Sequence, residues 1–130
     1  MVVRKDFDEW NKMKKKIDNK INFLEIKERQ VWWASVGLNI GDEENGKKNR
    51  YERPVLILKN FNNRICLTLP ISSKSGDEKF YHKIKINGLE NFVILSQIKL
   101  MSVKRLRRFI SKLYFNDFNQ IKERVIDLIK

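Results

Sequence analysis

The fold of this chain is decided by residues 53–73, which read RPVLILKNFNNRICLTLPISS. Within this stretch, two apolar runs at 55–61 and 65–69 are separated by the dipeptide Asn62-Asn63. Asparagine tolerates a positive φ, and such a dipeptide between two β-type runs is typical of a hairpin turn. We therefore predict an antiparallel pair of buried strands at the centre of the fold.

Further strands flank this hairpin in the predicted fold. The dipeptide Asn87-Gly88 is a strong signal for a type I′ turn, and it predicts a second hairpin. After Gln97 the pattern becomes short and irregular, and Ser102 is expected to cap a brief helix. The predicted strands outside the first hairpin lie at residues 31–36, 80–86, 92–95 and 109–113, with a polar loop over 37–52 and the brief helix over 103–106.

Both ends of the chain have the periodicity of amphipathic helices. In residues 1–27 apolar side chains recur at three- and four-residue steps between lysines, which predicts a helical extension whose apolar stripe docks on the domain. A second helix is expected at the C-terminus, with Asn116 as its cap. Its core-facing stripe is predicted to consist of Phe118, Ile121, Val125, Leu128 and Ile129.

The composition limits the class of protein. The 130 residues are 42% hydrophobic and 34% charged, which describes one soluble domain with a modest core. No apolar stretch approaches the ~20 residues that a membrane-spanning helix needs, and no hydrophobic signal core follows the N-terminus, so we expect a cytoplasmic protein without a membrane partner. Several short strands with terminal helices predict a mainly β protein, a small antiparallel barrel over residues 28–130.

Disulfide and zinc chemistry are not expected. Cys66 is the single cysteine, so an internal disulfide cannot form, and we predict that it is a core residue. His82 is the single histidine, so no Cys/His cluster is available as a metal site.

The charge indicates a polyanionic partner. The chain has 28 Lys and Arg residues against 16 Asp and Glu residues, for a formal net charge of +12. A positive charge of this size attracts nucleic acid, which is the favoured interpretation of the partner. Two alternatives stay open: the same positive charge would attract an acidic protein, or the lysines serve only to solvate the surface.

Four short motifs occur in a fixed order along the chain. They are Gly41-Asp42-Glu43-Glu44, Arg53-Pro54, Ser72-Ser73 and Ser96-Gln97, followed by the basic segment Lys104-Arg105-Leu106. Taken in this order, they resemble the motifs of the MazF/PemK family of toxin endoribonucleases. The resemblance covers roughly residues 29–130 and implies a small Src-homology-3-like barrel that forms a homodimer. It also implies cleavage of single-stranded RNA at short sequences without a metal or other cofactor, under inhibition by an antitoxin protein.

The chemistry of RNA cleavage gives three of these residues candidate roles. When a 2′-hydroxyl attacks the adjacent phosphorus, negative charge builds on the phosphate oxygens, and the Arg53 guanidinium is suited to clamp two of them. Ser72 matches the catalytic threonine of the family and offers a hydroxyl to the scissile phosphate. Glu43 is expected to orient Arg53 or to assist proton transfer. The sequence does not divide the acid and base roles among them, and His82 matches no catalytic position of the family.

Further residues are candidates for RNA binding. Trp32 and Trp33 are adjacent on a predicted strand and face opposite sides, so one is expected to fill the core while Trp33 contacts RNA or a dimer partner. Gln97 is expected either to read a base or to buttress the barrel. The lysine face of residues 1–27 is an alternative RNA surface. Ser73 is a further candidate for RNA binding. The predicted phosphate-steering rim consists of Lys47, Lys48, Arg50, Tyr51 and Lys74.

The chain departs from the family pattern at three points. The loop before Arg53 is longer, Ser96 stands where an acidic residue often precedes the glutamine, and the N-terminal extension has no counterpart. Two other functions therefore remain open. One is that of a CcdB-type toxin, which shares the barrel but binds DNA gyrase without chemistry. The other is a basic RNA-binding barrel whose catalytic site has decayed.

Overall fold

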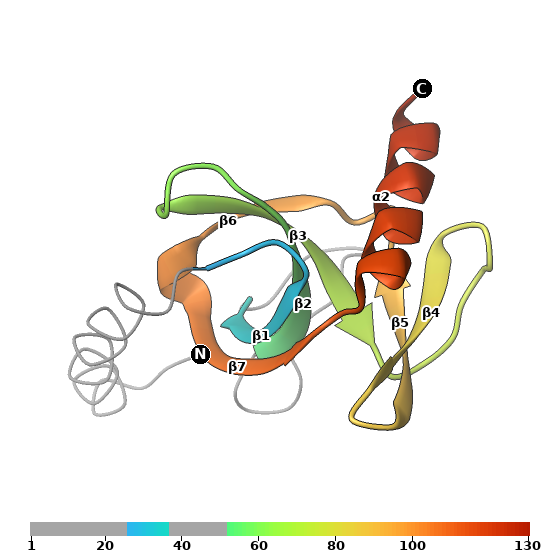
Figure 1. Ribbon diagram of the computed structural model, residues 1–130, viewed down its shortest axis with the longest axis horizontal. Helices are drawn as coiled ribbons and strands as arrows, with labels where there is room; N and C mark the ends of the chain where they lie inside the picture. The colour runs from blue at the N-terminus through green and yellow to red at the C-terminus, as the bar shows by residue number, and fades with distance from the viewer. Residues whose placement is uncertain (1–25, 37–51) are drawn as a thin grey trace.

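The computed structural model describes residues 26–36 and 52–130 (Figure 1). The predicted N-terminal helix and most of the loop before Arg53 lie outside the described residues. The elements are β1 (Gln30–Ser35), β2 (Glu52–Asn60), β3 (Ile65–Ser72), β4 (Tyr81–Ile86), β5 (Leu89–Ile94), β6 (Lys99–Ser102), the 3-10 helix η2 (Val103–Arg105), β7 (Leu106–Lys112) and α2 (Phe115–Ile129).

The strands form one curled antiparallel sheet in the order β4-β5-β3-β2-β1-β7, and β6 also pairs with β3. Because η2 joins β6 to β7, the chain itself links the strand beside β3 to the strand beside β1. The sheet thereby wraps into a partial barrel, with α2 against one side (Figure 1). The mainly β barrel with a C-terminal helix that the sequence predicts is confirmed.

The turn of the central β2–β3 hairpin is held by asparagine side chains, whose oxygens accept hydrogen bonds from backbone amides. Asn63 has a φ of 62°, and its amide donates to the Asn60 side chain over 2.9 Å. The Asn62 side chain accepts from the amides of Arg64 (2.9 Å) and Ile65 (3.0 Å). These are local side-chain hydrogen bonds of the kind that fix a turn and hence the register of the strands that it joins.

Both strands of this hairpin are longer than the sequence pattern predicts. Pro54 and Pro70 mark the ends of the apolar runs, yet each lies within a strand, where Pro54 is opposite Trp33 and Pro70 is opposite Val55. As a consequence, Arg53 and Ser72 are strand residues and not residues of the flanking loops. A strand fixes a side chain more rigidly than a loop does.

The second hairpin follows the prediction more closely. Asn87 and Gly88 have φ values of 51° and 82°, and two successive positive φ angles define the predicted type I′ turn. The Ser102 hydroxyl accepts from the amide of Lys104 at the start of η2, so the predicted cap of a brief helix is also confirmed. Strand β6 was not predicted, because it has only four residues and its Leu100 is exposed.

The core lies on both faces of β2. Val55 and Ile57 pack inside the curl with Trp32 and Cys66, while Leu56 packs beneath α2. A strand buried on both faces has no polar alternation, which accounts for the continuous apolar run in the sequence. Cys66 is a core residue as predicted, and burial raises the pKa of its thiol to about 11.

Helix α2 differs from the prediction at both ends. Tyr114, not Asn116, is the N-cap residue, and the Phe118 amide bonds to the Tyr114 carbonyl. The predicted stripe holds for Phe118, Ile121 and Val125, but Leu128 is 36% exposed and Ile129 is 70% exposed. The last turn projects beyond the sheet (Figure 1), and Ile129 lines an open apolar groove with Leu58 and Leu67 of the β2–β3 hairpin and does not join the closed core. In the described part of the chain, no helix has the length and apolar character to cross a membrane.

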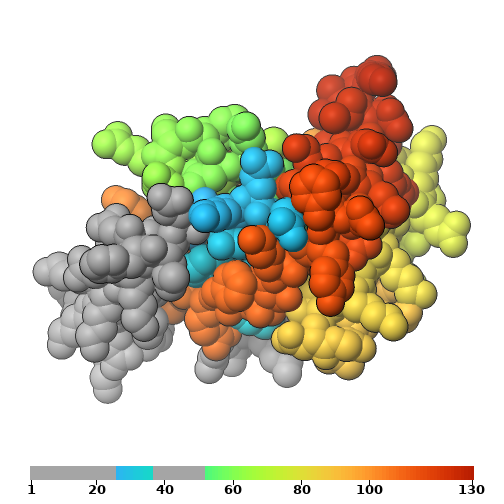
Figure 2. Space-filling view, in the orientation of Figure 1, coloured from blue at the N-terminus to red at the C-terminus, as the bar shows by residue number. Residues whose placement is uncertain are grey.

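His82 connects the sheet to α2. Its Nδ1 atom lies 3.1 Å from the Arg124 guanidinium, and because arginine is only a donor, the imidazole accepts this hydrogen bond in its neutral form. Burial, followed by the charge of Arg124, holds the pKa of His82 below its ordinary value, while Asp117 opposes the shift. Figure 2 shows α2 packed alongside the β4–β5 hairpin that carries this histidine.

We predict that the protein loses stability on mild acidification through this contact. Above pH 6.5, the ordinary pKa of histidine, the imidazole is neutral in both states and carries no penalty. As the pH falls below 6.5, the unfolded chain binds the proton first, so the free energy of unfolding decreases. In thermal melts, the melting temperature should therefore fall less between pH 7.5 and pH 5 for His82→Asn than for the wild type. The amide oxygen of this variant still accepts from Arg124. An equal loss in the two proteins would contradict the assignment.

Candidate active site

Arg53 and Ser72 lie on one face of neighbouring strands. In the β2–β3 ladder the last pair is Val55 with Pro70, and Arg53 and Ser72 each lie two residues beyond it, where Ser72 pairs with Phe92 of β5. Side chains alternate between the faces of a strand, so Arg53, Val55, Pro70 and Ser72 share one face. The Arg53 Nη2 atom also lies 3.4 Å from the Ile71 carbonyl oxygen, which holds the guanidinium beside β3.

Both polar side chains are largely removed from solvent. Arg53 is 5% exposed and Ser72 is 8% exposed. A charge in such a place is costly unless it is compensated, and it acts strongly on any anion that enters. Pro54 fixes its own φ and restricts Arg53 to an extended backbone, so the guanidinium begins from a well-defined position.

The Ser72 hydroxyl is oriented by the chain that follows it. Its oxygen accepts a hydrogen bond from the Lys74 amide over 3.0 Å. Since a hydroxyl can accept and donate at once, the Ser72 proton remains able to donate to a phosphate oxygen. Ser73 and Lys74, which follow it, are exposed.

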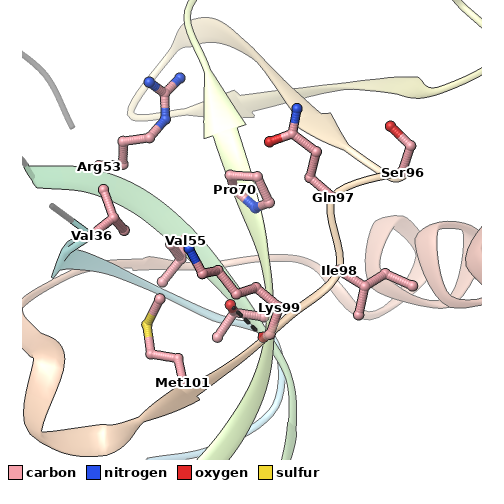
Figure 3. Close-up of a pocket in the computed structure, with 10 residues that line it drawn as sticks. Val36, Arg53, Val55, Pro70, Ser96, Gln97, Ile98, Lys99 and Met101 are labelled. Carbon is pink, nitrogen blue, oxygen red and sulfur yellow. Dashed lines mark hydrogen bonds between the residues drawn. The ribbon is translucent and has the colours of Figure 1, made fainter. Parts of the chain in front are cut away.

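A cavity of about 180 Å³ adjoins Arg53 (Figure 3). Its walls are about equally apolar and polar, and Gln97 comes from the segment between β5 and β6. The Thr68 hydroxyl donates to the Lys99 carbonyl over 3.0 Å, which ties the two strands that form the floor. None of the described residues that line it is acidic. These residues are Val36, Arg53, Val55, Thr68, Pro70, Ser96, Gln97, Ile98, Lys99 and Met101.

The predicted site residues are thus brought together in part. Arg53 and Gln97 line one cavity, and Ser72 lies on β3, the strand next to the one that carries Arg53. His82 lies on β4, separated from β3 by β5, and its imidazole contacts α2. Glu43, Lys47, Lys48 and Arg50 lie outside the described residues.

Trp33 is on the opposite face of the sheet from Arg53. It pairs with Pro54, the neighbour of Arg53, and alternation therefore points it away from the cavity. The Arg108 guanidinium lies over its ring at 5.5 Å from the centroid, a cation–π contact. Trp32 is buried and fills the core, as predicted for one of the two rings.

Glu52 is a buried carboxylate that the sequence interpretation missed. Its two oxygens lie 3.2 Å from Arg107 Nε and 3.6 Å from Arg108 Nη2, so it joins β2 to β7 on the face of Trp33. An acidic residue directly before Arg53, together with a later Arg-Arg pair, was a signal for this ion pair. Their contact across more than fifty residues of sequence was not visible without the topology.

Comparisons with known proteins identify the family of the chain. The sequence model of the family described as "PemK-like, MazF-like toxin of type II toxin-antitoxin system" matches residues 27–129. The chain therefore belongs to this toxin family. No curated protein sequence matches the chain.

Solved structures share the fold at low sequence identity. MazF from Deinococcus radiodurans superposes with a TM-score of 0.66 at 13% identity, over 80% of this chain and 96% of that one. A mycobacterial endoribonuclease in complex with its cognate antitoxin has a TM-score of 0.63 at 12% identity, over 80% and 94%. The Mycobacterium tuberculosis toxin MazF-mt6 has a TM-score of 0.60 at 16% identity, over 78% and 96%. At these identities the likeness establishes the fold alone.

We predict that Glu52→Gln destabilises the protein by roughly 1–2 kcal/mol, because two arginines lose a buried carboxylate but remain partly hydrated. Urea unfolding measures the change. Glu90→Gln is the matched control, since Glu90 pairs with Lys83 at 2.7 Å but is exposed. A control variant that loses as much stability as Glu52→Gln would contradict the special role of the buried pair.

Proposed function

We propose that this protein is a metal-independent endoribonuclease that cleaves single-stranded RNA by attack of a 2′-hydroxyl on the adjacent phosphorus. The proposal rests on Arg53 and Ser72 being largely buried on one face of the β2–β3 hairpin, each two residues beyond the Val55–Pro70 pair. The family membership supports it, because toxins of this family are generally endoribonucleases. A dianionic transition state suits a buried guanidinium with a hydroxyl beside it.

The proposed reaction balances without a metal ion. The bond from the 2′-oxygen to phosphorus forms while the bond from phosphorus to the 5′-oxygen breaks. A base takes the 2′ proton, and an acid supplies a proton to the departing 5′-oxygen. The products are a 2′,3′-cyclic phosphate and a 5′-hydroxyl. Arg53 clamps the phosphate oxygens, Ser72 donates a hydrogen bond, and Glu43 is proposed to orient Arg53 or move a proton.

The cavity beside Arg53 is proposed to hold a base next to the cleaved bond. Its apolar lining residues suit the faces of a nucleobase, and the Gln97 amide can both donate and accept at a base edge. Lys74 and Ser73 extend the site at the rim. The cavity lies on the face opposite Trp33, so stacking of a base on Trp33 would require the RNA to pass around the edge of the sheet.

The proposed partners follow from the charge and the family. The net charge of +12 attracts both RNA and an acidic antitoxin, and one structural relative is a complex with its cognate antitoxin. We propose that this chain likewise binds an antitoxin, forms a homodimer and acts in the cytoplasm.

The mechanism predicts that the purified protein cuts long single-stranded RNA in the presence of EDTA. Fragments should carry a cyclic phosphate and a 5′-hydroxyl. An RNA with a single 2′-deoxy nucleotide at the cut site should survive at that site, because the nucleophile is absent. Strict dependence on magnesium, or cleavage of the deoxy substrate, would exclude the mechanism, whereas the absence of any cleavage would favour a non-catalytic toxin.

Arg53→Ala should lower the rate of RNA cleavage by at least ~100-fold, the scale of losing one preorganised charge. The control is Arg64→Ala, which removes an exposed arginine in the β2–β3 turn. Rates are compared under single-turnover conditions, and melting temperatures confirm folding. If the Arg53 variant is folded and cuts like the control, Arg53 has no catalytic role.

Substitutions at Ser72 test the hydroxyl separately from side-chain shape. Ser72→Thr should keep most of the activity, whereas Ser72→Val should lose at least ~10-fold, since the two side chains differ chiefly in the hydroxyl. Both β-branched residues suit a strand. Equal activity of the folded Thr and Val variants would show that the hydroxyl is not used.

Gln97→Ala should change the preference for the bases that flank the cut sites more than it lowers the rate of cleavage. The reason is that Gln97 lines the cavity and is not one of the two proposed catalytic residues. Mapping of fragment ends on a long RNA gives the sequence preference. Gln120→Ala, at an exposed position of α2, should leave the preference unchanged. An unchanged preference in the Gln97 variant as well would place base recognition elsewhere.

A further inference from the structure

The guanidinium of Arg124 on α2 donates several hydrogen bonds to one short segment of the chain. Nη2 donates to the carbonyl oxygens of Glu78 and, over 3.2 Å, Lys79. Nη1 donates to the Tyr81 carbonyl over 3.3 Å and to His82 Nδ1 over 3.1 Å. One half-buried side chain thus spans four acceptors between residues 78 and 82, and these contacts exceed what docking a helix on a sheet requires.

The segment that Arg124 holds is a single tight turn. The amides of Phe80 and Tyr81 both donate to the Asp77 carbonyl, over 2.9 and 3.0 Å. Carbonyl groups at the end of such a turn lack partners within it, and a cation is favourable there. Gly76 packs against the Tyr81 ring so closely that a Cβ atom would lie 2.4 Å from a ring carbon.

This turn connects the two sides of the candidate site. On one side, residues 73–77 lead to it from Ser72, whose hydroxyl is oriented by the Lys74 amide. On the other side, the Phe80 carbonyl accepts from the Leu95 amide over 2.7 Å. Leu95 immediately precedes the Ser96-Gln97 segment that lines the cavity. A shift of the turn would therefore move the Ser72 hydroxyl and the Gln97 wall relative to each other.

We propose that Arg124 is a positioning residue for RNA cleavage, an inference that rests on the proposed function. It does not contact the substrate. By fixing the turn at residues 78–82 it sets the geometry between the Ser72 hydroxyl and the base-binding wall at Gln97. Small misplacements of reacting groups cost large factors in rate, so the contact should be visible in kinetics.

The test compares Arg124→Ala, Arg124→Lys and the surface control Arg64→Ala with the wild-type protein in single-turnover RNA cleavage. Arg124→Ala should lower kcat/KM at least ~10-fold. Arg124→Lys should remain folded, since it keeps the charge and the aliphatic stem, but should still lose several-fold in rate because an ammonium group cannot span the four acceptors. Millimolar guanidinium ion should restore part of the rate of Arg124→Ala and leave Arg64→Ala unchanged.

Hydrogen exchange of the Lys74 and Leu95 amides gives a second readout that does not depend on activity. Both amides should exchange faster in Arg124→Lys than in the wild type or in Arg64→Ala. If a folded Arg124→Lys cuts RNA at the wild-type rate and its two amides remain protected, the inference is overturned. If the wild-type protein does not cut RNA, the proposed function fails instead, and unchanged exchange in Arg124→Lys would then remove the positioning role as well.

Discussion

The register of the β2–β3 hairpin is the constraint on which the rest of the structure depends. Asn62 and Asn63 fix the turn, the register then shifts between Lys59 and Ile57, and the ladder beyond this shift pairs Val55 with Pro70. A further slip by one residue would turn every side chain beyond the shift to the other face. Burial on both faces of β2 forbids such a slip, because Leu56 and Ile57 belong to different core clusters. The hydrophobic core therefore sets the distance between the catalytic candidates.

Charge is placed on this frame in two different ways. On the face of Trp33, the Glu52 carboxylate compensates Arg107 and Arg108 and holds β7 to β2. On the opposite face, Arg53 adjoins a cavity whose described lining residues include no acid. Adjacent residues of one strand thus supply a structural ion pair and a candidate anion site. Alternation along the strand keeps the two from neutralising each other.

Much of the fold could be predicted because its signals are local. The turns at Asn62-Asn63 and Asn87-Gly88 are encoded by residues that tolerate positive φ. The start of the brief helix is encoded by Ser102, whose hydroxyl directly precedes it. The strand ends were not predictable, because proline usually marks a boundary and here Pro54 and Pro70 lie inside strands.

The rest of the site depended on contacts between distant parts of the chain. Arg53 and Ser72 were chosen from the family resemblance and the chemistry, and only the register shows them on one face. Trp33 could be separated from Trp32 by alternation, but not assigned a face without its pairing to Pro54. The acceptors of Arg124 lie more than forty residues away in sequence, so no local pattern indicated that contact.

The central claim is that Arg53 and Ser72 act together on one phosphate, and a double-mutant cycle tests it most directly. Single-turnover rates in EDTA would be measured for Arg53→Ala, Ser72→Ala, the double variant and the wild type. Residues that act as a unit give strongly non-additive losses. The account predicts that the double variant is little slower than the more damaging single variant. Losses that multiply, with all four proteins folded, would show two independent residues and contradict the account.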